Sequence, residues 1–379
     1  MAGLESLKNY IEKNEFRGYD PYDALSSPLF KLPIFRSNKL IRFGAQQFVK
    51  RSPINVRPLL FVPKGLNPVT LGLCIQGYAY LYLSEHERQD EYRSQILKLT
   101  EELMKLIPQG FSGACWGYDF DWEARHAKIP AYQPTVVATG IIINALHIAN
   151  EAIKDERLSA LIVSAADFVT NDLNRTQLGE GLCFSYSPTD HQQVFNASMK
   201  GVRVLAQAYA ISKNEALMDL AQQAVKFVAD NQRADGSWVY SLAKSGGWVD
   251  NYHTGYVLDC LSAYQQLSGR GEGLREVISK GYSYYVQNFI EENGMPKFYN
   301  NKACPVDCTA AAQTILTTIR FDDVRLATKV CGWMTDNMQK KNGSFAFRKY
   351  RTYTEKTSFM RWSDAWMFAA MSNLNYVLR

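Results

Sequence analysis

The densest group of chemically versatile side chains lies in the eleven residues from Trp116 to His126. It contains Trp116, Asp119, Asp121, Trp122, Arg125 and His126. Aromatic rings can stack on sugar faces, arginine binds carboxylates or phosphates with two hydrogen bonds, and a carboxylic acid can protonate a leaving oxygen. We therefore predict a saccharide site in which Asp119 or Asp121 is the acid or base and Arg125 holds an anion. A salt bridge between Asp121 and Arg125 that only holds the loop is the structural alternative.

A second group runs from Trp248 to Thr254 at the start of an expected helix. Asp250 or Asn251 is placed to cap that helix, which is a structural duty. His253 then falls in the first turn, where the helix dipole favours the neutral imidazole, and can act as a base. We predict that His253 and Tyr252 form a proton-transfer pair and that Trp248 and Asp250 contact substrate. A histidine with a purely structural role is the alternative.

Other segments at equivalent places in the chain hold further polar and aromatic side chains. Those predicted to bind substrate, together with Trp116, Trp122, Arg125, His126, Trp248 and Asp250, are Tyr186, Asp307, Arg361, Trp362 and Asp364. Arg361 is a second candidate for the anion clamp. Asp307 and Asp364 could equally cap helices.

These groups are spaced by a repeat of about 55 to 60 residues. Each copy has a Gly-x-aromatic turn, a polar cluster and a helix rich in small residues. The turns begin at Gly113, Gly181, Gly236, Gly294 and Gly343. A more charged amphipathic stretch separates successive small-residue helices, as in 90–107, 155–171, 214–231, 274–291 and 322–339. A repeated helical hairpin of this kind, six times over, predicts an all-α, closed (α/α)6 toroid.

The connections indicate where a site would lie. Links from outer to inner helices are long, so we expect them to gather at one face together with the N-termini of the inner helices, forming a funnel. Residues 1–65 carry no repeat and are predicted to be an N-terminal arm packed on the barrel, with an amphipathic helix near 37–50. We expect this arm to form part of the first hairpin or cover it, and to shape one side of the funnel. Residues 66–379 form the toroid, in a single domain overall.

Composition sets broad limits. The chain has 379 residues, 46% of them hydrophobic, and a mild net charge of +5 without a dense basic run, which gives no support to nucleic-acid binding. No apolar stretch reaches 18 residues and the first residues lack a signal-peptide core, so we expect a cytoplasmic protein without membrane insertion. Seven scattered cysteines indicate reduced thiols, not a disulfide framework.

Two partial similarities point to isoprenoid-acting toroids. Asp307-Cys308 and Tyr252-His253-Thr254 resemble the zinc ligands of protein prenyltransferase β subunits, but their order and spacing differ, so we expect no metal and no cofactor. Gln232 to Trp238 resembles the Gln-Trp repeat of triterpene cyclases, whose Asp-rich acid motif is missing here. We expect this element to staple a helix end to a loop.

A closer resemblance rests on six ordered motifs, from about residue 10 to the C-terminus. They are Gly18 to Leu25, Trp116 to Trp122, Phe184 to Ser187, Asp250 to Tyr256, Pro305 to Gln313 and Met360 to Trp366. They resemble a bacterial family encoded in surface-polysaccharide gene clusters, the polysaccharide biosynthesis proteins of the Vibrio Vps type. In that family a histidine follows the Pro-x-Asp element and a glutamine occupies the position of Asp364. Cys308, Thr309 and Asp364 stand there in this chain, which puts in doubt a mechanism that needs that histidine.

The resemblance implies a protein that makes or modifies a capsule, O-antigen or exopolysaccharide. A saccharide or sugar nucleotide is the expected substrate, glycosidase, lyase or epimerase chemistry the expected reaction, and other polysaccharide-assembly enzymes are conceivable partners. Two alternatives stay open: a prenyltransferase-like or terpene-cyclase-like enzyme with an aromatic, apolar funnel, and a non-catalytic glycan-binding or scaffold protein.

Overall fold

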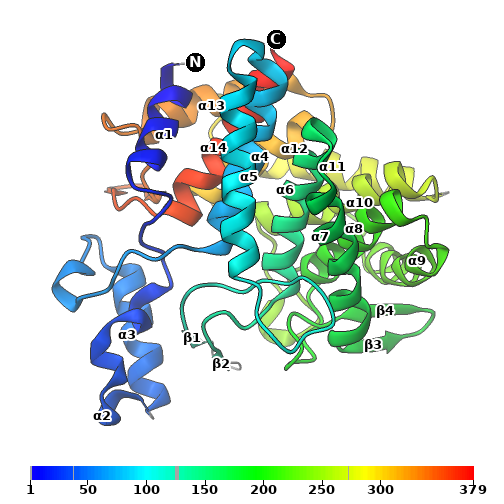
Figure 1. Cartoon of the computed structure of the whole chain (residues 1–379), viewed down its shortest axis with the longest axis horizontal. Coiled ribbons are helices and arrows are strands. Elements are labelled where there is room, and N and C mark those ends of the chain that lie inside the picture. Colours follow the sequence, from blue (N-terminus) through cyan, green and yellow to red (C-terminus); the bar gives the residue numbers. More distant parts are fainter. Residues whose placement is uncertain (1, 37, 124–127, 272) are drawn as a thin grey trace.

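The computed structural model describes residues 2–36, 38–123, 128–271 and 273–379. Within these ranges six inner helices, labelled in Figure 1, form a ring around a central axis. They are α4 (Pro68–Ser84), α6 (Val136–Ile153), α8 (Phe195–Ser212), α10 (Asn251–Ser268), α12 (Cys308–Arg320) and α14 (Trp366–Val377). Each packs on the next, and α14 packs on α4, so the ring is closed. The predicted (α/α)6 toroid is confirmed.

The second layer consists of outer helices that pack against the inner ones. They are α5 (Gln89–Lys105), α7 (Glu156–Asp167), α9 (Glu215–Asp230), α11 (Leu274–Phe289), α13 (Val324–Met338) and α1 (Ala2–Lys13). Their apolar stripes are buried and their charged faces lie in water, as the periodicity predicts. Inner helices are buried almost all round, since both neighbours and an outer helix cover them.

The repeated turn glycines show how α1 completes the outer layer. Gly236 and Gly294 have φ of +94° and +88°, and an added Cβ would lie 2.6 Å and 2.8 Å from carbonyl oxygens of α11 and α13. Only glycine allows both this backbone conformation and this approach. Gly343 has φ of +90° and its added Cβ would lie 2.1 Å from the carbonyl oxygen of Ser6 in α1. The helix at the start of the chain therefore takes the sixth outer position, beside α14.

Bonds to both flanks hold α1 in that position. The Gln339 amide donates to the Gly3 carbonyl at 2.7 Å, and the Tyr78 hydroxyl donates to Glu12 at 2.7 Å. The arm expected over residues 1–65 thus consists of two parts: residues 2–13 belong to the ring, and the segment that follows reaches the funnel. Sequence analysis did not assign the sixth outer helix because the repeat signal is interrupted by the chain ends.

The Gln-Trp element of the fourth hairpin is the predicted staple. The Gln232 amide donates to the carbonyls of Gly236 and Val277 at 3.0 Å and 2.9 Å, and the Trp238 indole N–H donates to Val228 at 2.9 Å. The turn is thereby tied to both α9 and α11.

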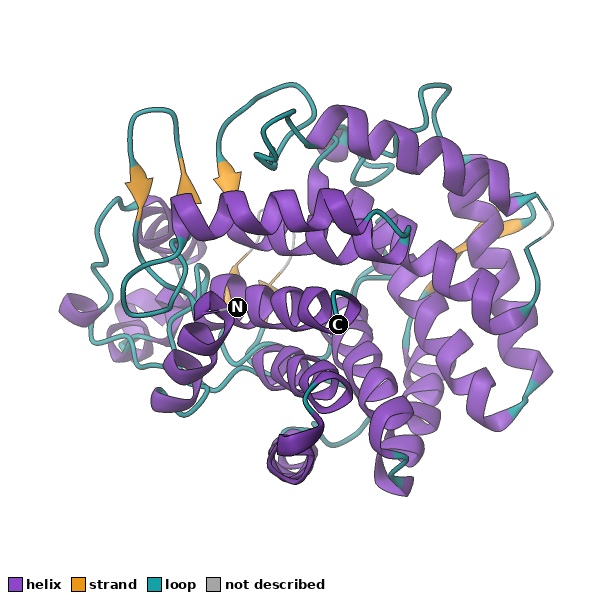
Figure 2. Cartoon of the chain, turned by 90° about the horizontal axis from the view of Figure 1, so that it is seen from above, coloured by secondary structure: helices purple, strands orange, loops and turns teal. Residues whose placement is uncertain are grey.

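The long loops gather where the inner helices begin, and this end of the ring is called the mouth. Short strands occur in these loops (Figure 2): β1 (Trp122–Glu123) with β2 (Lys128–Ile129), β3 (Arg175–Leu178) with β4 (Gly181–Phe184), and β5 (Val306–Asp307), β6 (Arg348–Lys349) and β7 (Thr354–Glu355), all antiparallel. Two helices of the N-terminal segment, α2 (Pro33–Arg36) and α3 (Lys39–Arg51), project from the body near β1 and β2.

Helix α6 is long and apolar enough to cross a membrane, with a mean hydropathy of 1.5 over 18 residues. Of that window, 78% is buried inside the ring. The helix is an inner helix of the toroid, and core helices pass the same test.

Candidate functional site

The mouth contains a cavity of about 280 Å³, here called the mouth pocket, lined by loops and by the first turns of the inner helices. Its lining is dominated by aromatic rings: Tyr22, Tyr118, Phe120, Trp122, Tyr186, Tyr240, Trp248, Tyr252, Tyr256, Trp362 and Trp366. Val137, Ile141, Asn196, His253, Thr309 and Arg361 complete it. The predicted residues Trp122, Tyr186, Trp248, Tyr252, His253, Arg361 and Trp362, far apart in sequence, thus meet around one space.

His253 is held in this pocket by Asp250. Asp250 is the residue before α10, and its Oδ1 accepts from the His253 backbone N–H at 3.1 Å, as a helix cap does. Its Oδ2 lies 2.7 Å from His253 Nδ1 and also accepts from the Trp248 indole N–H at 2.8 Å. A carboxylate at Nδ1 fixes that nitrogen as the donor, leaving Nε2 as the basic nitrogen. Asp250 therefore caps the helix and orients the imidazole at once.

Aromatic rings surround the imidazole. The rings of Tyr240 and Tyr252 have centroids 4.6 Å and 4.0 Å from that of His253, and Tyr240 stacks on Trp248 at 4.6 Å. The His253 side chain is 18% exposed, so it stays reachable from the pocket. No group in the described part of the chain hydrogen-bonds Nε2, and this nitrogen is available to a ligand.

The phenols of the pocket are kept neutral. Burial raises the pKa of Tyr252, Tyr186 and Tyr256 well above the usual range, with further upward contributions from Asp250 for Tyr252 and from Tyr118 for the other two. Neutral phenols donate hydrogen bonds and can give a proton to a developing oxyanion. The pocket thus offers one base and several weak acids.

A second, more polar cavity of about 520 Å³ opens outside the mouth pocket and is here called the outer cleft. The two cavities share Tyr22, Trp248, Tyr252 and His253. Three cations line the outer cleft, Lys50, Arg51 and Arg348, together with Asp250 and several tyrosines. His253 therefore stands between an aromatic inner space and a cationic outer one.

Arg361 lines the mouth pocket with its charge already balanced. Its Nε and Nη2 donate to the two carboxylate oxygens of Asp20 at 2.6 Å and 2.9 Å, and its guanidinium lies 4.8 Å from the Tyr118 ring centroid. Both partners of the ion pair are buried. Sequence analysis chose Arg361 but not Asp20, which comes from the N-terminal segment, 341 residues away along the chain.

The two predicted catalytic carboxylates lie outside the pocket lining. Asp119 accepts from the Asn67 amide at 2.5 Å and packs so tightly on Gly65 that a Cβ there would lie 1.8 Å from its Oδ2. Asp121 accepts from Arg42 Nη2 at 3.0 Å and from the Ala131 N–H at 3.0 Å. Both anchor the mouth loop to neighbouring segments, and Arg42 is the described cation that pairs with Asp121. The alternative pairing with Arg125 lies outside the described residues.

Three of the remaining predicted residues make structural contacts, and two lie outside the described residues. Trp116 is fully buried and donates to the Leu103 carbonyl, away from the pocket. Asp307 caps α12 and accepts from Arg348 and Trp362, so it supports residues that line the two cavities. Asp364 is fully buried, accepts from the Phe345 N–H and the Ser358 hydroxyl, and lies outside the lining. Arg125 and His126 lie outside the described residues.

Sequence analysis missed several lining residues, among them Tyr22, Tyr240, Tyr256 and Trp366. Tyr22 is in the Gly18 to Leu25 motif, and Tyr240 follows the Trp238 turn by two residues, so both carried a local signal. Tyr256 and Trp366 look like core residues of inner helices, and only ring closure shows that they face the axis.

The possible metal ligands of the described residues are dispersed. The described residues include no group of three His, Cys, Asp or Glu side chains close enough to hold an ion. Cys308 is buried as a free thiol, and burial raises its pKa well above the usual range, which disfavours the thiolate that metals bind.

Comparison with solved structures gives the same fold. A sugar epimerase from a ruminal bacterium matches with a TM-score of 0.65 and 12% identity over 84% of this chain and 90% of that one. Cellobiose 2-epimerase from Bacillus thermoamylovorans matches with a TM-score of 0.66 and 8% identity over 99% of both chains. A glycoside hydrolase family 76 mannosidase from Bacteroides thetaiotaomicron matches with a TM-score of 0.63 and 8% identity, over 100% of this chain and 99% of that one. No family model and no curated protein matches the chain by sequence. These similarities establish the six-hairpin toroid.

Proposed function

We propose that this protein is a carbohydrate-active enzyme that moves a proton at a sugar carbon, by epimerisation or by β-elimination. The observation that carries the proposal is the Asp250 and His253 pair, 2.7 Å apart, in an aromatic pocket at the mouth. The structural neighbours described as epimerases and as a polysaccharide lyase use the same toroid, which supports the choice by analogy of fold.

The lining favours proton transfer over glycoside hydrolysis. Hydrolysis normally needs two carboxyl groups about 5 to 10 Å apart across the scissile bond. The described lining of the mouth pocket contains no Asp or Glu. The carboxylates that bond to lining residues are engaged: Asp250 with His253 and Trp248, Asp20 with Arg361, and Asp307 with Trp362. A histidine with a free Nε2 can instead remove a proton next to a carbonyl or carboxylate.

The proposed step uses the groups already described. His253 Nε2 accepts the proton from the sugar carbon, and Asp250 stabilises the resulting imidazolium through Nδ1–H. A neutral phenol such as Tyr252 donates to the oxygen on which negative charge develops. In epimerisation a proton returns to the opposite face of the same carbon, whereas in β-elimination the glycosidic oxygen leaves with a proton and a double bond forms.

The outer cleft indicates the substrate class. Lys50 and Arg51, which pair with no carboxylate among the described residues, would attract an anionic saccharide such as a uronic-acid chain or a sugar nucleotide, while Trp122 or Trp248 stacks on a sugar ring. Arg348 is already paired with Asp307. Such substrates fit the proposed role, implied by the Vps-type motifs, in making or modifying a bacterial surface polysaccharide.

One observation favours a second candidate. The strongly aromatic lining is what an isoprenoid-acting toroid would need. Prenyl diphosphate enzymes, however, also need ligands for the metal that accompanies the diphosphate, and the described residues contain no group of three His, Cys, Asp or Glu side chains placed to supply them. A thermal shift with prenyl diphosphate and magnesium, and none with saccharides, would favour this candidate.

The test is proton exchange in D2O with uronic-acid oligosaccharides, neutral disaccharides and nucleotide sugars. We expect deuterium incorporation at one sugar carbon, or an ultraviolet-absorbing unsaturated product, from the wild type and neither from His253→Gln. Release of reducing sugar without exchange would contradict proton transfer and indicate hydrolysis.

A further inference from the structure

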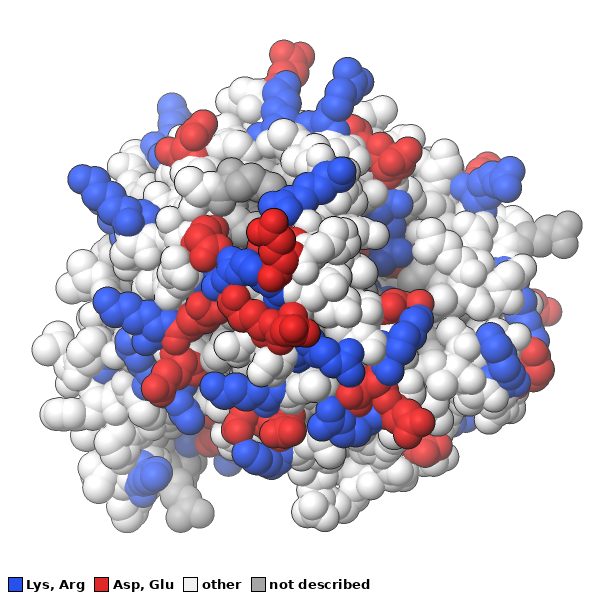
Figure 3. Space-filling model, turned by 45° about the horizontal axis from the view of Figure 1, so that its top comes forward, with Lys and Arg blue, Asp and Glu red and all other residues white. Residues whose placement is uncertain are grey.

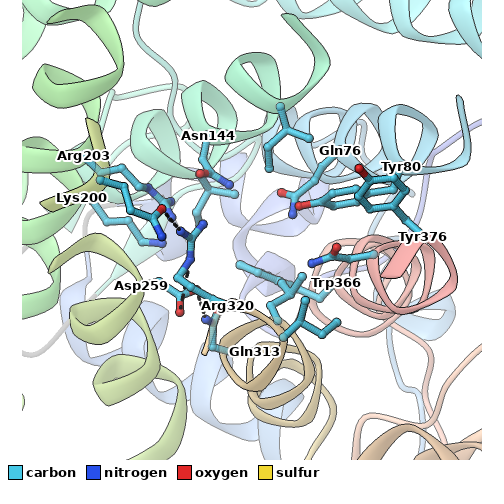
Figure 4. A pocket seen from close by; sticks show the side chains of 16 residues that line it. Gln76, Tyr80, Asn144, Lys200, Arg203, Asp259, Gln313, Arg320, Trp366 and Tyr376 are labelled. Atoms are coloured by element: carbon cyan, nitrogen blue, oxygen red, sulfur yellow. Dashed lines mark hydrogen bonds and ion pairs between the residues drawn. The ribbon is translucent and has the colours of Figure 1, made fainter. Parts of the chain in front are cut away.

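The opposite end of the toroid holds a second cavity that the proposed reaction does not use. It measures about 330 Å³ and is lined by the middle and C-terminal turns of the inner helices, together with Trp366 at the start of α14. It is here called the axial pocket (Figure 4). The mouth pocket and the axial pocket share only Ile141 and Trp366, which therefore separate them along the axis. Figure 3 brings this end forward and shows basic and acidic side chains interspersed over it.

Three cations line the axial pocket, against one carboxylate. Lys200 and Arg203 come from α8, Arg320 comes from α12, and Asp259 comes from α10 (Figure 4). Asp259 accepts from Gln313 at 2.8 Å and from Thr317 at 3.0 Å, and lies 3.9 Å from Arg320. The carboxylate is thus engaged by α12, and the two cations of α8 have no acidic partner among the described residues.

Lys200 and Arg203 are buried with unused donors. Lys200 is 2% exposed, and its ammonium makes one described contact, 3.7 Å from the Tyr256 ring centroid. Arg203 is 4% exposed, donates through Nη2 to the Gly140 carbonyl at 3.1 Å, and has no partner for Nε. Buried charges without partners are costly, so an unpaired pair of cations around a cavity indicates a missing anion.

We propose that the axial pocket binds a small oxyanion, the phosphate or carboxylate of a metabolite, between Lys200 and Arg203. The amide side chains of Gln76, Asn144 and Asn373, from three further inner helices, face the same space. They can serve the hydroxyl or carbonyl oxygens of the rest of the ligand. This site is independent of the reaction proposed for the mouth.

The first test is calorimetric titration of the full chain with inorganic phosphate, followed by a hexose phosphate. We expect saturable one-to-one binding that is at least about tenfold weaker in Lys200→Met and in Arg203→Met. The exposed Lys341→Gln is the control and should bind as the wild type does. In phosphate-free buffer Lys200→Met should be at least as stable as the wild type, because it removes an unpaired buried charge.

The competing explanation is that these cations only stabilise the fold, Lys200 through the Tyr256 ring and Arg203 through the Gly140 carbonyl. In that case the wild type would show no saturable phosphate binding and Lys200→Met would unfold at a lower temperature. Unchanged phosphate affinity in both variants would also overturn the proposal, since the anion would then bind elsewhere, for example at the cations of the outer cleft.

A second observation, independent of the first, concerns the segment that projects beside the mouth. Residues 28–64 contain eight Lys and Arg and no Asp or Glu. The same segment exposes large apolar side chains: Ile34 by 74%, Leu40 by 82%, Phe48 by 64%, Ile54 by 67%, Leu59 by 76% and Phe61 by 69%. Soluble monomers rarely gather so much exposed apolar surface in one place.

Helix α3 is amphipathic, but it buries polar side chains and exposes large apolar ones. Its inward face is Arg42, Gln46 and Val49, of which Arg42 pairs with Glu123 at 3.2 Å. Its outward face includes Leu40 and Phe48, eight residues apart and therefore on one side of the helix. The apolar side of α3 thus faces solvent and is available to contact another apolar surface.

We propose that α2, α3 and the loop through Phe61 bind the surface of an anionic lipid bilayer. Exposed Lys31 and Lys64 would meet lipid headgroups while the apolar side chains enter the interface. A second copy of the chain would bring the same cations to the contact and be repelled. The ammonium of Lys50 lies 4.0 Å from the ring centroid of Tyr22, which lines the mouth pocket, so bilayer binding would place the mouth near the lipid headgroups.

The test is co-sedimentation with phosphatidylcholine vesicles, with and without phosphatidylglycerol. We expect binding to the anionic vesicles that weakens with added salt and falls at least about tenfold in a Leu40→Ser, Phe48→Ser double variant. Leu378→Ser, which removes an exposed leucine elsewhere, should bind as the wild type does.

Two results would overturn the bilayer proposal. One is absence of binding to anionic vesicles. The other is a wild-type dimer, seen by light scattering, that the double variant converts to monomer, because a second copy would then cover this face.

Discussion

The two ends of the toroid axis are built from the same helices and have opposite chemistry. At the mouth, where the inner helices begin, Arg361 and Arg348 are each paired with a buried carboxylate, Asp20 and Asp307. At the axial end, Lys200 and Arg203 lack such partners. Helix N-termini carry partial positive charge and C-termini partial negative charge. Cations beside the helix N-termini at the mouth therefore need carboxylates to hold them. Lys200 and Arg203, the sixth and ninth residues of α8, lie beyond the reach of either end of that helix, so their charges remain free for a ligand.

The largest expected effect is on turnover, which should depend on a histidine at the mouth and not on one away from it. His253→Gln keeps a hydrogen bond to Asp250 but loses the basic nitrogen, so turnover should fall by about 10² to 10⁴. His147→Gln is the matched control, because His147 lies on α6 away from the mouth pocket lining. Its turnover should stay near that of the wild type. Equal losses in the two variants would remove His253 from the reaction.

The next prediction compares how much the arginine at each end, Arg361 and Arg203, contributes to the free energy of unfolding. Arg361→Leu leaves the buried carboxylate of Asp20 without its partner, and should lower the free energy of unfolding by about 3 to 5 kcal/mol. Arg203→Leu leaves no described carboxylate unpaired and should cost clearly less. Urea unfolding of both variants measures the difference. A larger loss for Arg203→Leu would mean that the axial cations are the structural ones.

The pH dependence of stability should reveal Lys200. Burial, and after it the nearby Arg203, lowers the pKa of Lys200 from 10.5 to about 7, with Cys260, Asp259 and Arg320 as the other contributing groups. Between these two values the unfolded chain binds one more proton than the folded one, so stability rises with pH in that window. Lys200→Met should lack this rise when the two proteins are compared from about pH 7 to about pH 10. The same slope in both would show that Lys200 keeps its proton in the fold.

The smallest effect concerns aromatic contacts at the two ends. Trp248 and Tyr376 are both 41% exposed, the first at the mouth and the second at the axial rim. If Trp248 stacks on the sugar, Trp248→Ala should raise KM by roughly 3 to 10 fold, as expected from about 0.5 to 1.5 kcal/mol of lost contact. Tyr376→Ala should leave KM unchanged. Steady-state kinetics on the substrate found in the exchange experiment decide this.

The fold was predictable because it is a local pattern repeated. Gly236, Gly294 and Gly343 mark turns whose backbone requires glycine, and the helices between them show their buried stripe within a few turns of chain. The sixth outer helix was not predictable in this way, since α1 stands at the far end of the sequence from its partner α14. Nothing local indicates that pairing.

The site was predictable only in part. His253 and Asp250 are three residues apart and share one helix start, so the capping argument placed them correctly relative to each other. The carboxylates Asp119 and Asp121 are just as polar and just as close in sequence to aromatic rings. Their partners, Asn67 and Arg42, come from distant segments and turn them away from the pocket.

The amino-acid sequence by itself determined the inner helices, five of their outer partners and the end of the ring at which the long loops gather, because helix periodicity and turn chemistry act over a few residues. Tertiary structure alone decided which polar groups face the axis and which of them are paired. Arg361 meets Asp20 across 341 positions, while Lys200 and Arg203 meet no carboxylate in the described chain. Charge balance inside a closed ring depends on every helix around it, and no single segment of sequence contains that information.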